Sequence, residues 1–241
     1  MATCIPENPS VSAGIGVISY NSYVAYVAKS IGPGWGFDCS QKLSPAQVKS
    51  MVATPLPNGQ KVSFIFRYVS LNPTLWPGDI DPIERDSILG QGVPLLLVQH
   101  VNYPGWTASG WNGAAHGNQA GLNAKQIDYP AGAMIFVDME GIADSGGPVY
   151  EYLQAWAEAV AGFGYVPAMY QGYACGMTPD LLAQHTEIGG WWSDFGARPN
   201  PTGVGFMCKQ FAQVMHCNVP VDPDKCYADM LGRTLVGMST V

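Results

Sequence analysis

The sequence predicts an α/β fold, a single (β/α)8 barrel of the TIM type whose last units are irregular. The chain has 241 residues, close to the ~250 that are typical of one such barrel. Short apolar runs recur along it, each followed by turn residues and then by a segment with helical periodicity. About eight such runs in this length fit a closed barrel better than an open sheet.

Eight segments are predicted to be strands. Most of them are apolar throughout, which is typical of strands that are buried on both faces of a parallel sheet. Their alternation with helical segments predicts parallel pairing through right-handed crossovers. The segments are residues 35–38, 62–69, 94–101, 133–140, 166–171, 190–194, 205–212 and 219–222.

Helices are predicted between these strands. Ser44 and Pro45 form an N-cap and a first helical residue, and residues 82–91 form a second helix. The clearest helix covers residues 148–163, where apolar residues recur at i, i+3 and i+4. Another begins at Thr178 and runs to about residue 185, and the glycine-rich segment 102–121 is expected to lead into a helix that shapes the cleft.

Residues 34–241 are predicted to form one barrel domain after an N-terminal extension, residues 1–33, whose role is open. The first residues lack a basic region and an uninterrupted apolar region, so no signal peptide is expected. We therefore expect cytoplasmic synthesis, followed by use there, by association with a virion or by release without a signal peptide. No apolar run reaches the ~18 residues of a membrane span.

Charge and cysteine content narrow the function classes. The net charge of −7 speaks against nucleic-acid binding and against attraction to anionic surfaces. The six cysteines form no C-x₂₋₄-C pair, so free buried thiols are expected rather than a metal site, and no cofactor is expected. A Cys217–Cys226 bridge stays as an alternative in an oxidising compartment.

Polar residues gather at the carboxyl ends of the predicted strands, where barrel enzymes have their active sites. Asp138 and Glu140 share one face of their strand, with Cα atoms ~6.5–7 Å apart. Their repulsion should raise one pKa, and a protonated carboxyl beside an ionised one is what general-acid cleavage of glycosides requires. The alternative is structural, with Asp138 capping a helix and Glu140 paired to Arg67. The other candidates at strand ends are Asp38, Arg67, Tyr68, Gln99, His100, Tyr170, Gln171, Trp192, Asp194, Gln210 and Asp222.

Six segments carry a family resemblance: WGFDCS, FIFRYVS, IFVDMEG, YVPAMYQG, GGWWSDF and KQFAQ…VPVDPD. Together they resemble the glycoside-hydrolase-like barrels of unknown function, which are relatives of the family-25 lysozymes. Those lysozymes are α/β barrels that cleave the glycan strands of peptidoglycan. The resemblance covers about residues 34–230.

The resemblance implies roles for several residues. Glu140 resembles the general acid, and Asp138 the residue that orients the acetamido group of the sugar or stabilises positive charge. Asp38 and Asp194 resemble the accessory carboxylates, and Asp38 is counted with the catalytic set. The implied substrate-binding residues are Asp194, Gln210 and Asp222, with Tyr68, Tyr170 and Trp192 as sugar platforms or, alternatively, core residues. Arg67, Gln99, His100 and Gln171 join the substrate-binding set because of their places at strand ends.

Two functions remain open at this point. The first is hydrolysis of an N-acetylated polysaccharide, with peptidoglycan as the leading substrate and the polysaccharide as the partner. The second is a non-catalytic glycan-binding or structural barrel in a larger assembly such as a phage particle, with other proteins as partners. The acidity of the chain and the lack of a signal peptide or an appended wall-binding domain favour the second.

One motif points elsewhere. DSGGPV at residues 144–149, with His116, is similar to the nucleophile and histidine segments of trypsin-like proteases. His116 and Ser145 are too close in sequence to have most of two β-barrels between them, and strand–helix alternation excludes an all-β fold. Residues 145–148 are therefore predicted to be a loop with Pro148 in the first turn of the next helix.

Overall fold

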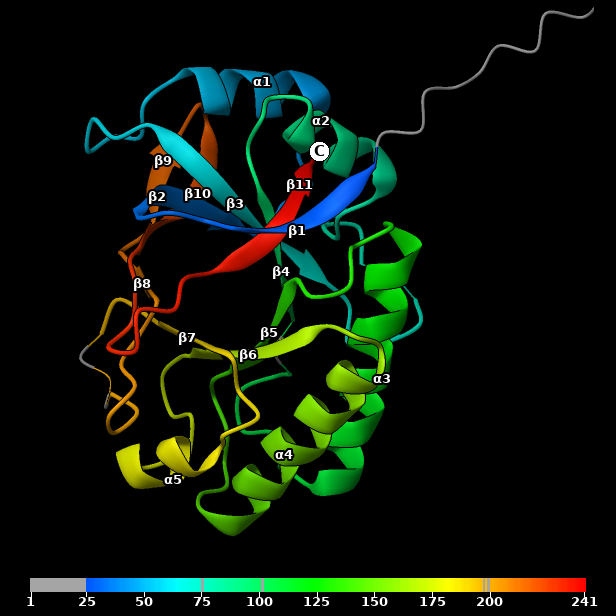
Figure 1. Ribbon diagram of the computed structural model, residues 1–241, viewed down its shortest axis with the longest axis vertical. Coiled ribbons are helices and arrows are strands. Elements are labelled where there is room, and N and C mark those ends of the chain that lie inside the picture. The colour runs from blue at the N-terminus through cyan, green and yellow to red at the C-terminus, as the bar shows by residue number, and fades with distance from the viewer. Residues whose placement is uncertain (1–24, 75, 101, 197, 199) are drawn as a thin grey trace, which may run out of the picture.

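A closed barrel of eight strands forms the body of the molecule (Figure 1). The computed structural model describes residues 25–74, 76–100, 102–196, 198 and 200–241. Around the barrel the order is β4-β3-β2-β10-β8-β7-β6-β5, and β5 pairs with β4 to close it. The strands are β2 (Gly34–Cys39), β3 (Val62–Val69), β4 (Leu95–Gln99), β5 (Met134–Met139), β6 (Val166–Gln171), β7 (Gly190–Ser193), β8 (Cys208–Gln210) and β10 (Val219–Cys226).

The last units depart from the regular plan, as predicted. β2 to β8 are parallel to one another, but β10 runs antiparallel to both of its neighbours, β2 and β8. A hairpin strand, β9 (Val214–His216), stands between β8 and β10 where a crossover helix would otherwise lie. A hairpin connection as short as the one between β9 and β10 joins only antiparallel strands. The expectation that the final strand is parallel is therefore wrong, although its position is confirmed.

Five helices in the described residues cover the outside of β2 to β7: α1 (Pro45–Ala53), α2 (Pro82–Leu89), α3 (Gly110–Gln126), α4 (Gly147–Gly162) and α5 (Pro179–Gln184). The predicted starts are confirmed. Ser44 forms a capping box with Gln47, Thr178 caps α5, and Pro148 lies in the first turn of α4. None of the helices that the structure describes has the length and hydropathy to span a membrane.

The glycine-rich segment becomes most of α3, because its glycines allow close contact with α4. A Cβ atom at Gly113 would lie 2.1 Å from the carbonyl oxygen of Tyr152. One at Gly117 would lie 2.5 Å from the carbonyl oxygen of Trp156. Figure 1 shows the two helices side by side. The glycines therefore allow α3 and α4 to pack closely. This packing explains why a segment rich in glycine, a poor helix former, is helical.

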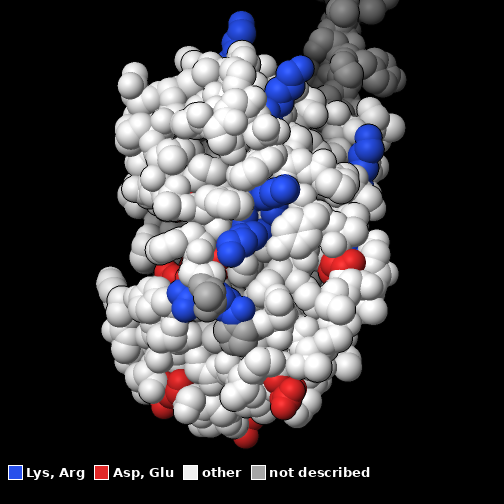
Figure 2. Space-filling view, turned by 90° about the vertical axis from the view of Figure 1, so that its left-hand side faces the viewer, with Lys and Arg blue, Asp and Glu red and all other residues white. Residues whose placement is uncertain are grey.

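On the side of the barrel at β8 and β10, no helix follows β8 among the described residues, and β9 takes its place and contacts α1 through His216 Nε2, 2.9 Å from the oxygen of Met51 (Figure 1). Lys209 and Lys225 stand directly opposite each other across β8 and β10. The Lys225 ammonium also lies 5.8 Å from the centre of the Trp35 ring. Lys and Arg side chains gather over the middle of this face (Figure 2). Outward positions without a helix above them thus carry charge rather than apolar side chains.

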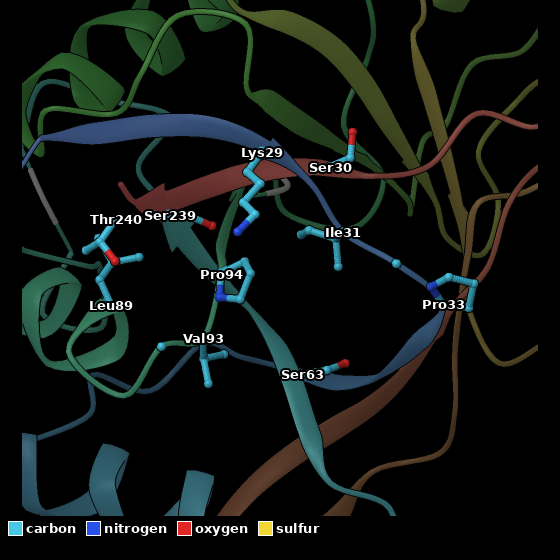
Figure 3. Close-up of a pocket in the computed structure, with 12 residues that line it drawn as sticks. Lys29, Ser30, Ile31, Pro33, Ser63, Leu89, Val93, Pro94, Ser239 and Thr240 are labelled. Atoms are coloured by element: carbon cyan, nitrogen blue, oxygen red, sulfur yellow. The ribbon is translucent and has the colours of Figure 1, made fainter.

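Two further strands, which the sequence did not predict, lie at the amino-terminal end of the barrel. β1 (Tyr26–Ser30) pairs with β11 (Val236–Thr240), and β11 joins β4 through Met238 and Leu95. Part of the predicted extension therefore belongs to the barrel sheet, and its residues 1–24 lie outside the described residues. Lys29 and Ser239 point into a hollow of about 350 Å³ at this end (Figure 3).

The barrel interior is a packed core below the opposite end. Phe64, Phe66, Phe136 and Trp192 fill it, and the Phe66 and Trp192 rings stack with their centres 4.2 Å apart. Residues of each strand point alternately inward and outward. The inward residues at the carboxyl ends of the parallel strands therefore rise from this aromatic floor into the mouth.

Candidate active site

A hollow of about 400 Å³ opens at the carboxyl ends of the parallel strands. Asp138 and Glu140, from β5 and the residue after it, both border it, as their i, i+2 spacing predicts. Asp138 is buried, whereas Glu140 is partly exposed. The other residues that line the hollow are Tyr68, Tyr170, Phe195, Gln210, Ala212, Gln213 and Asp222.

Asp38 lies beneath this hollow and holds its floor together. Its carboxylate accepts a 3.0 Å hydrogen bond from the Tyr68 hydroxyl and a 2.8 Å hydrogen bond from Gln210 Nε2. The Tyr170 hydroxyl then donates to Gln210 Oε1 at 2.9 Å. Asp38 is 2% exposed and does not border the hollow. It therefore meets the hollow only through its hydrogen bonds with Tyr68 and Gln210, which border it.

A second buried aspartate, Asp224, completes the group and was not predicted. β10 places Asp222 opposite Asp38, and Asp224 lies two residues further along the same inward face. Trp192 Nε1 donates to Asp224 Oδ1 at 2.9 Å, while Asp224 Oδ2 and Asp138 Oδ1 have no partner among the described residues. The D-x-D spacing in VPVDPD was the signal, the same spacing that singled out Asp138 and Glu140.

Burial and mutual repulsion raise the pKa values of these carboxyls. Burial, together with the charge of Asp222, raises the pKa of Asp38 to about 7. Burial and then the charges of Glu140 and Asp38 hold the pKa of Asp138 well above its usual value. For Asp224, burial and the nearby Asp38 charge also raise the pKa well above the usual value. These carboxyls therefore keep their protons to a higher pH than exposed aspartates do.

Glu140 differs from the buried aspartates because it combines a raised pKa with access to the hollow. Burial is the largest cause of its raised pKa, followed by the charge of Asp194, which the Arg198 guanidinium partly offsets. Arg198 makes an ion pair with Asp194 at the rim. Asp194 is thus placed beside the hollow rather than in its lining. A carboxyl that keeps its proton to a higher pH than usual and reaches the hollow is suited to donate that proton.

Close packing fixes the position of Glu140. Gly172 follows β6, and a Cβ atom there would lie 2.4 Å from Glu140 Cβ and 2.5 Å from Glu140 Oε2. No side chain fits at residue 172 unless Glu140 moves. On its other side, Trp106 Nε1 donates to the backbone oxygen of Glu140 at 2.9 Å. The acid is therefore held by its neighbours rather than by a partner for its carboxyl.

Three predicted substrate-binding residues face the wrong way, and those predictions are wrong. Arg67 points outward to α2, where Nε donates to Glu84 Oε1 at 2.6 Å and Nη2 donates to the oxygen of Gly78. Gln99 also points outward, donating to backbone oxygens and accepting from Trp156 Nε1. Gln171 donates to Cys175 Sγ in the same outer layer. Each precedes or follows an inward residue, so strand alternation sends it away from the mouth.

Trp192 is also not a sugar platform. It faces inward but lies too deep, with 0% of its surface exposed between Phe66 and Tyr170. His100 faces inward too and borders a neighbouring hollow instead of the acidic one. Tyr68 and Tyr170 remain at the mouth, as do Gln210 and Asp222.

The protease-like motif contains no catalytic arrangement. Asp144 Oδ2 accepts a hydrogen bond from the backbone nitrogen of Ala108 at 2.7 Å. His116 Nδ1 lies 2.8 Å from the Tyr152 hydroxyl, in the contact between α3 and α4. Ser145 belongs to the loop before α4, as predicted. Both His116 and the motif thus serve the fold outside the barrel.

A closed α/β barrel with a carboxyl cluster at its mouth defines the class of glycoside-hydrolase-like barrels. The sequence model of the family described as "Rv2525c-like, glycoside hydrolase-like domain" matches residues 58–215, more than half of the chain. The chain belongs to this family, which confirms the resemblance found in the sequence. No curated protein matches it.

Solved structures share this fold. The Tat-secreted protein Rv2525c of Mycobacterium tuberculosis, solved with L-tartrate, has a TM-score of 0.60 at 16% identity, over 83% of this chain and 98% of that one. An uncharacterized B. stearothermophilus protein has a TM-score of 0.58 at 19% identity, over 80% and 95%. The modular autolysin LytC of Streptococcus pneumoniae, solved with a synthetic peptidoglycan ligand, has 0.57 at 12% identity, over 81% of this chain and 47% of that one.

Proposed function

We propose that this protein hydrolyses glycosidic bonds in an N-acetylated polysaccharide, with peptidoglycan as its substrate. The observation that carries the proposal is the convergence of Asp138, Glu140 and Asp222 on one open hollow, over a buried pair of aspartates. The glycoside-hydrolase-like family supports it. So does LytC, a protein of similar fold that was solved with a synthetic peptidoglycan ligand.

Glu140 is the proton donor in this proposal. Its raised pKa keeps the carboxyl protonated to a higher pH than an ordinary glutamic acid. In the transition state it transfers its proton to the glycosidic oxygen while the bond from that oxygen to the anomeric carbon breaks. The carboxylate left behind accepts a proton from the water that finally adds to the anomeric carbon, which restores the acid.

Asp138 orients the sugar. Burial and the charges of Glu140 and Asp38 hold its pKa well above the usual value, and in the protonated form it offers one donor and one acceptor. An acetamido group offers the matching C=O and N–H. Asp138 Oδ1 is buried and has no hydrogen-bond partner among the described residues, so such a contact requires the carboxyl to turn Oδ1 toward the hollow that Asp138 borders. A buried polar atom of this kind gains free energy when a substrate satisfies it.

The remaining carboxylates supply negative potential. Positive charge develops on the sugar ring as the glycosidic bond breaks. Asp222 borders the hollow, and Asp194 lies close enough to influence Glu140. Fixed negative charges in a partly dry site stabilise such a transition state without reorganisation.

The test compares Glu140→Gln with Glu151→Gln, the same change at an exposed position on α4. The measurement is the release of reducing ends from purified peptidoglycan. Loss of the proton donor should lower the rate about 10²–10⁴-fold, with an unchanged melting temperature, and Glu151→Gln should keep full activity. Equal activity of Glu140→Gln and the unchanged protein would exclude Glu140 as the acid.

A second outcome would replace the proposal by its alternative. If the unchanged protein binds purified walls but releases no reducing ends over a range of pH, the barrel is a glycan-binding or structural module. Release of soluble fragments without new reducing ends would instead indicate cleavage of the peptide part of the wall.

A further inference from the structure

A row of three stacked rings leads away from the acidic hollow. His100 lies between Tyr68 and Trp76, with ring centres 4.7 Å apart on both sides. Tyr68 belongs to the lining of the acidic hollow, whereas His100 and Trp76 border a second hollow of about 390 Å³. The two hollows are therefore neighbours that share this row of rings as a wall.

The row is held in place by a buried aspartate. Asp79 is 3% exposed and accepts hydrogen bonds from the Ser70 hydroxyl at 2.6 Å and from the backbone nitrogen of Trp76 at 2.7 Å. Its other oxygen lies 2.9 Å from His100 Nε2. Burial alone would raise the pKa of Asp79, but these contacts lower it below the usual value. The carboxylate is thus ionised and fixes Trp76 relative to His100 before any ligand arrives.

Two exposed aromatic side chains border the second hollow. Trp76 is 43% exposed and Tyr103 is 83% exposed at its border. Two amide side chains, Asn72 and Asn102, stand beside them. The faces of pyranose rings are apolar and their edges carry hydroxyl and acetamido groups. Aromatic faces combined with amide donors and acceptors match that chemistry.

We propose that this second hollow, bordered by Asn72, Trp76, His100, Asn102 and Tyr103, binds a further sugar unit of the glycan chain whose scissile bond lies at Glu140. The inference rests on the proposed function and extends it, because it makes the protein selective for chains longer than those that fill the acidic hollow alone. Trp76 is the platform, held by the Asp79 contacts, and Tyr103, which borders the same hollow, offers a second aromatic ring. Remote binding of this kind aligns the reacting bond with the acid.

The experiment measures binding of chitin oligosaccharides, which are N-acetylated and carry no peptide. It uses the full chain with Glu140→Gln, so that no cleavage occurs, and compares the dimer with the tetramer by titration calorimetry. The tetramer should bind about tenfold more tightly, equivalent to about 1.4 kcal/mol. Adding Trp76→Ala should reduce tetramer affinity to that of the dimer, and Tyr103→Ala should remove part of the gain.

The matched control is Trp111→Ala, which removes an 80% exposed aromatic side chain from α3, outside both hollows. It should leave both affinities unchanged. Three outcomes would overturn the inference. The tetramer could still bind more tightly than the dimer in Trp76→Ala and Tyr103→Ala, Trp111→Ala could lose the same affinity, or neither oligosaccharide could bind.

Hydrolysis separates this inference from the proposed function. If the tetramer binds through Trp76 but the unchanged protein releases no reducing ends, the subsite stands and the hydrolase proposal fails. If the unchanged protein cleaves purified peptidoglycan and Trp76→Ala and Tyr103→Ala cleave it equally fast with no change in chain-length preference, the hydrolase stands and the subsite is excluded.

Discussion

The inner and outer faces of the same barrel strands carry polar residues with opposite properties. Arg67 and Tyr68 are neighbours on β3, yet Arg67 is sealed against α2 in an ion pair with Glu84, while Tyr68 borders the acidic hollow. On the outer face, a buried charge is paired with an opposite charge. Inside, Asp38, Asp138 and Asp224 meet one another, and their pKa values rise. The outer polar residues stabilise the fold, and the inner ones are suited to chemistry.

The largest expected effect is a loss of stability, and it comes from a change on the outer face of the barrel strands. Arg67→Met leaves the buried Glu84 charge without its partner, and such losses lower the free energy of unfolding by about 3–5 kcal/mol. Thermal unfolding should show a lower melting temperature, while kcat of folded protein on purified peptidoglycan stays unchanged.

The matched control is Lys42→Met, which removes the cation from the more exposed Lys42–Asp81 pair. It should lower the free energy of unfolding by only about 0.2–1 kcal/mol. A loss of activity in folded Arg67→Met would contradict the separation of stabilising outer residues from reactive inner ones, because it would place Arg67 in contact with the substrate.

An inner change of smaller size is Gly172→Ala. The added Cβ meets Glu140 Cβ and Oε2, so the acid must move. Since misplacement by about 1 Å can lower a rate by about 10²-fold, we expect a loss of that order in reducing-end release with little change in melting temperature. Gly162→Ala, where a Cβ meets nothing within 4 Å, serves as the control, and equal activities of the two variants would refute the positioning of Glu140 by Gly172.

The smallest effect should appear in the pH dependence of stability. The pKa of Asp224 is raised in the folded protein, so the folded state retains a proton that the unfolded chain loses above a pH of about 3.9. Stability from this group is therefore complete at low pH and falls as pH rises toward the folded pKa. The same holds for Asp38, whose stabilisation is lost between about pH 4 and pH 7.

Asp224→Asn imitates the protonated form and keeps an oxygen for Trp192 Nε1. It should match the unchanged protein at pH 4 and melt about 3 °C higher at pH 8, equivalent to about 1 kcal/mol in a chain of this size. Differential scanning calorimetry from pH 4 to pH 8 would show the flatter profile. A variant that melts lower at every pH would mean that Asp224 is ionised in the folded protein.

The sequence was most informative where one local rule decides the outcome. Caps and prolines located the starts of α1, α4 and α5, and the D-x-E spacing placed Asp138 and Glu140 together. The same period of two would have separated Arg67 from Tyr68 and Gln99 from His100, had it been applied to every strand end. It would also have added Asp224 to the site.

Other features depend on tertiary contacts that no local pattern encodes. The direction of β10 follows from the hairpin that precedes it, and the pairing of β1 with β11 joins the two ends of the described chain. The depth of Trp192 depends on how the barrel interior fills. The row of Tyr68, His100 and Trp76 combines a residue of β3 with residues of the loops after β3 and β4, and Asp79 fixes the approach of those two loops.

The pairing of β1 with β11 has a practical consequence. Val241 N donates to the oxygen of Ala25 at 3.2 Å, at the end of the barrel remote from Glu140. A flexible tether joined to residue 241 would therefore leave the mouth unobstructed. Immobilised on beads in that orientation, the protein would direct its carboxyl cluster away from the bead surface, which makes residue 241 a suitable point of attachment for pull-down and turnover assays.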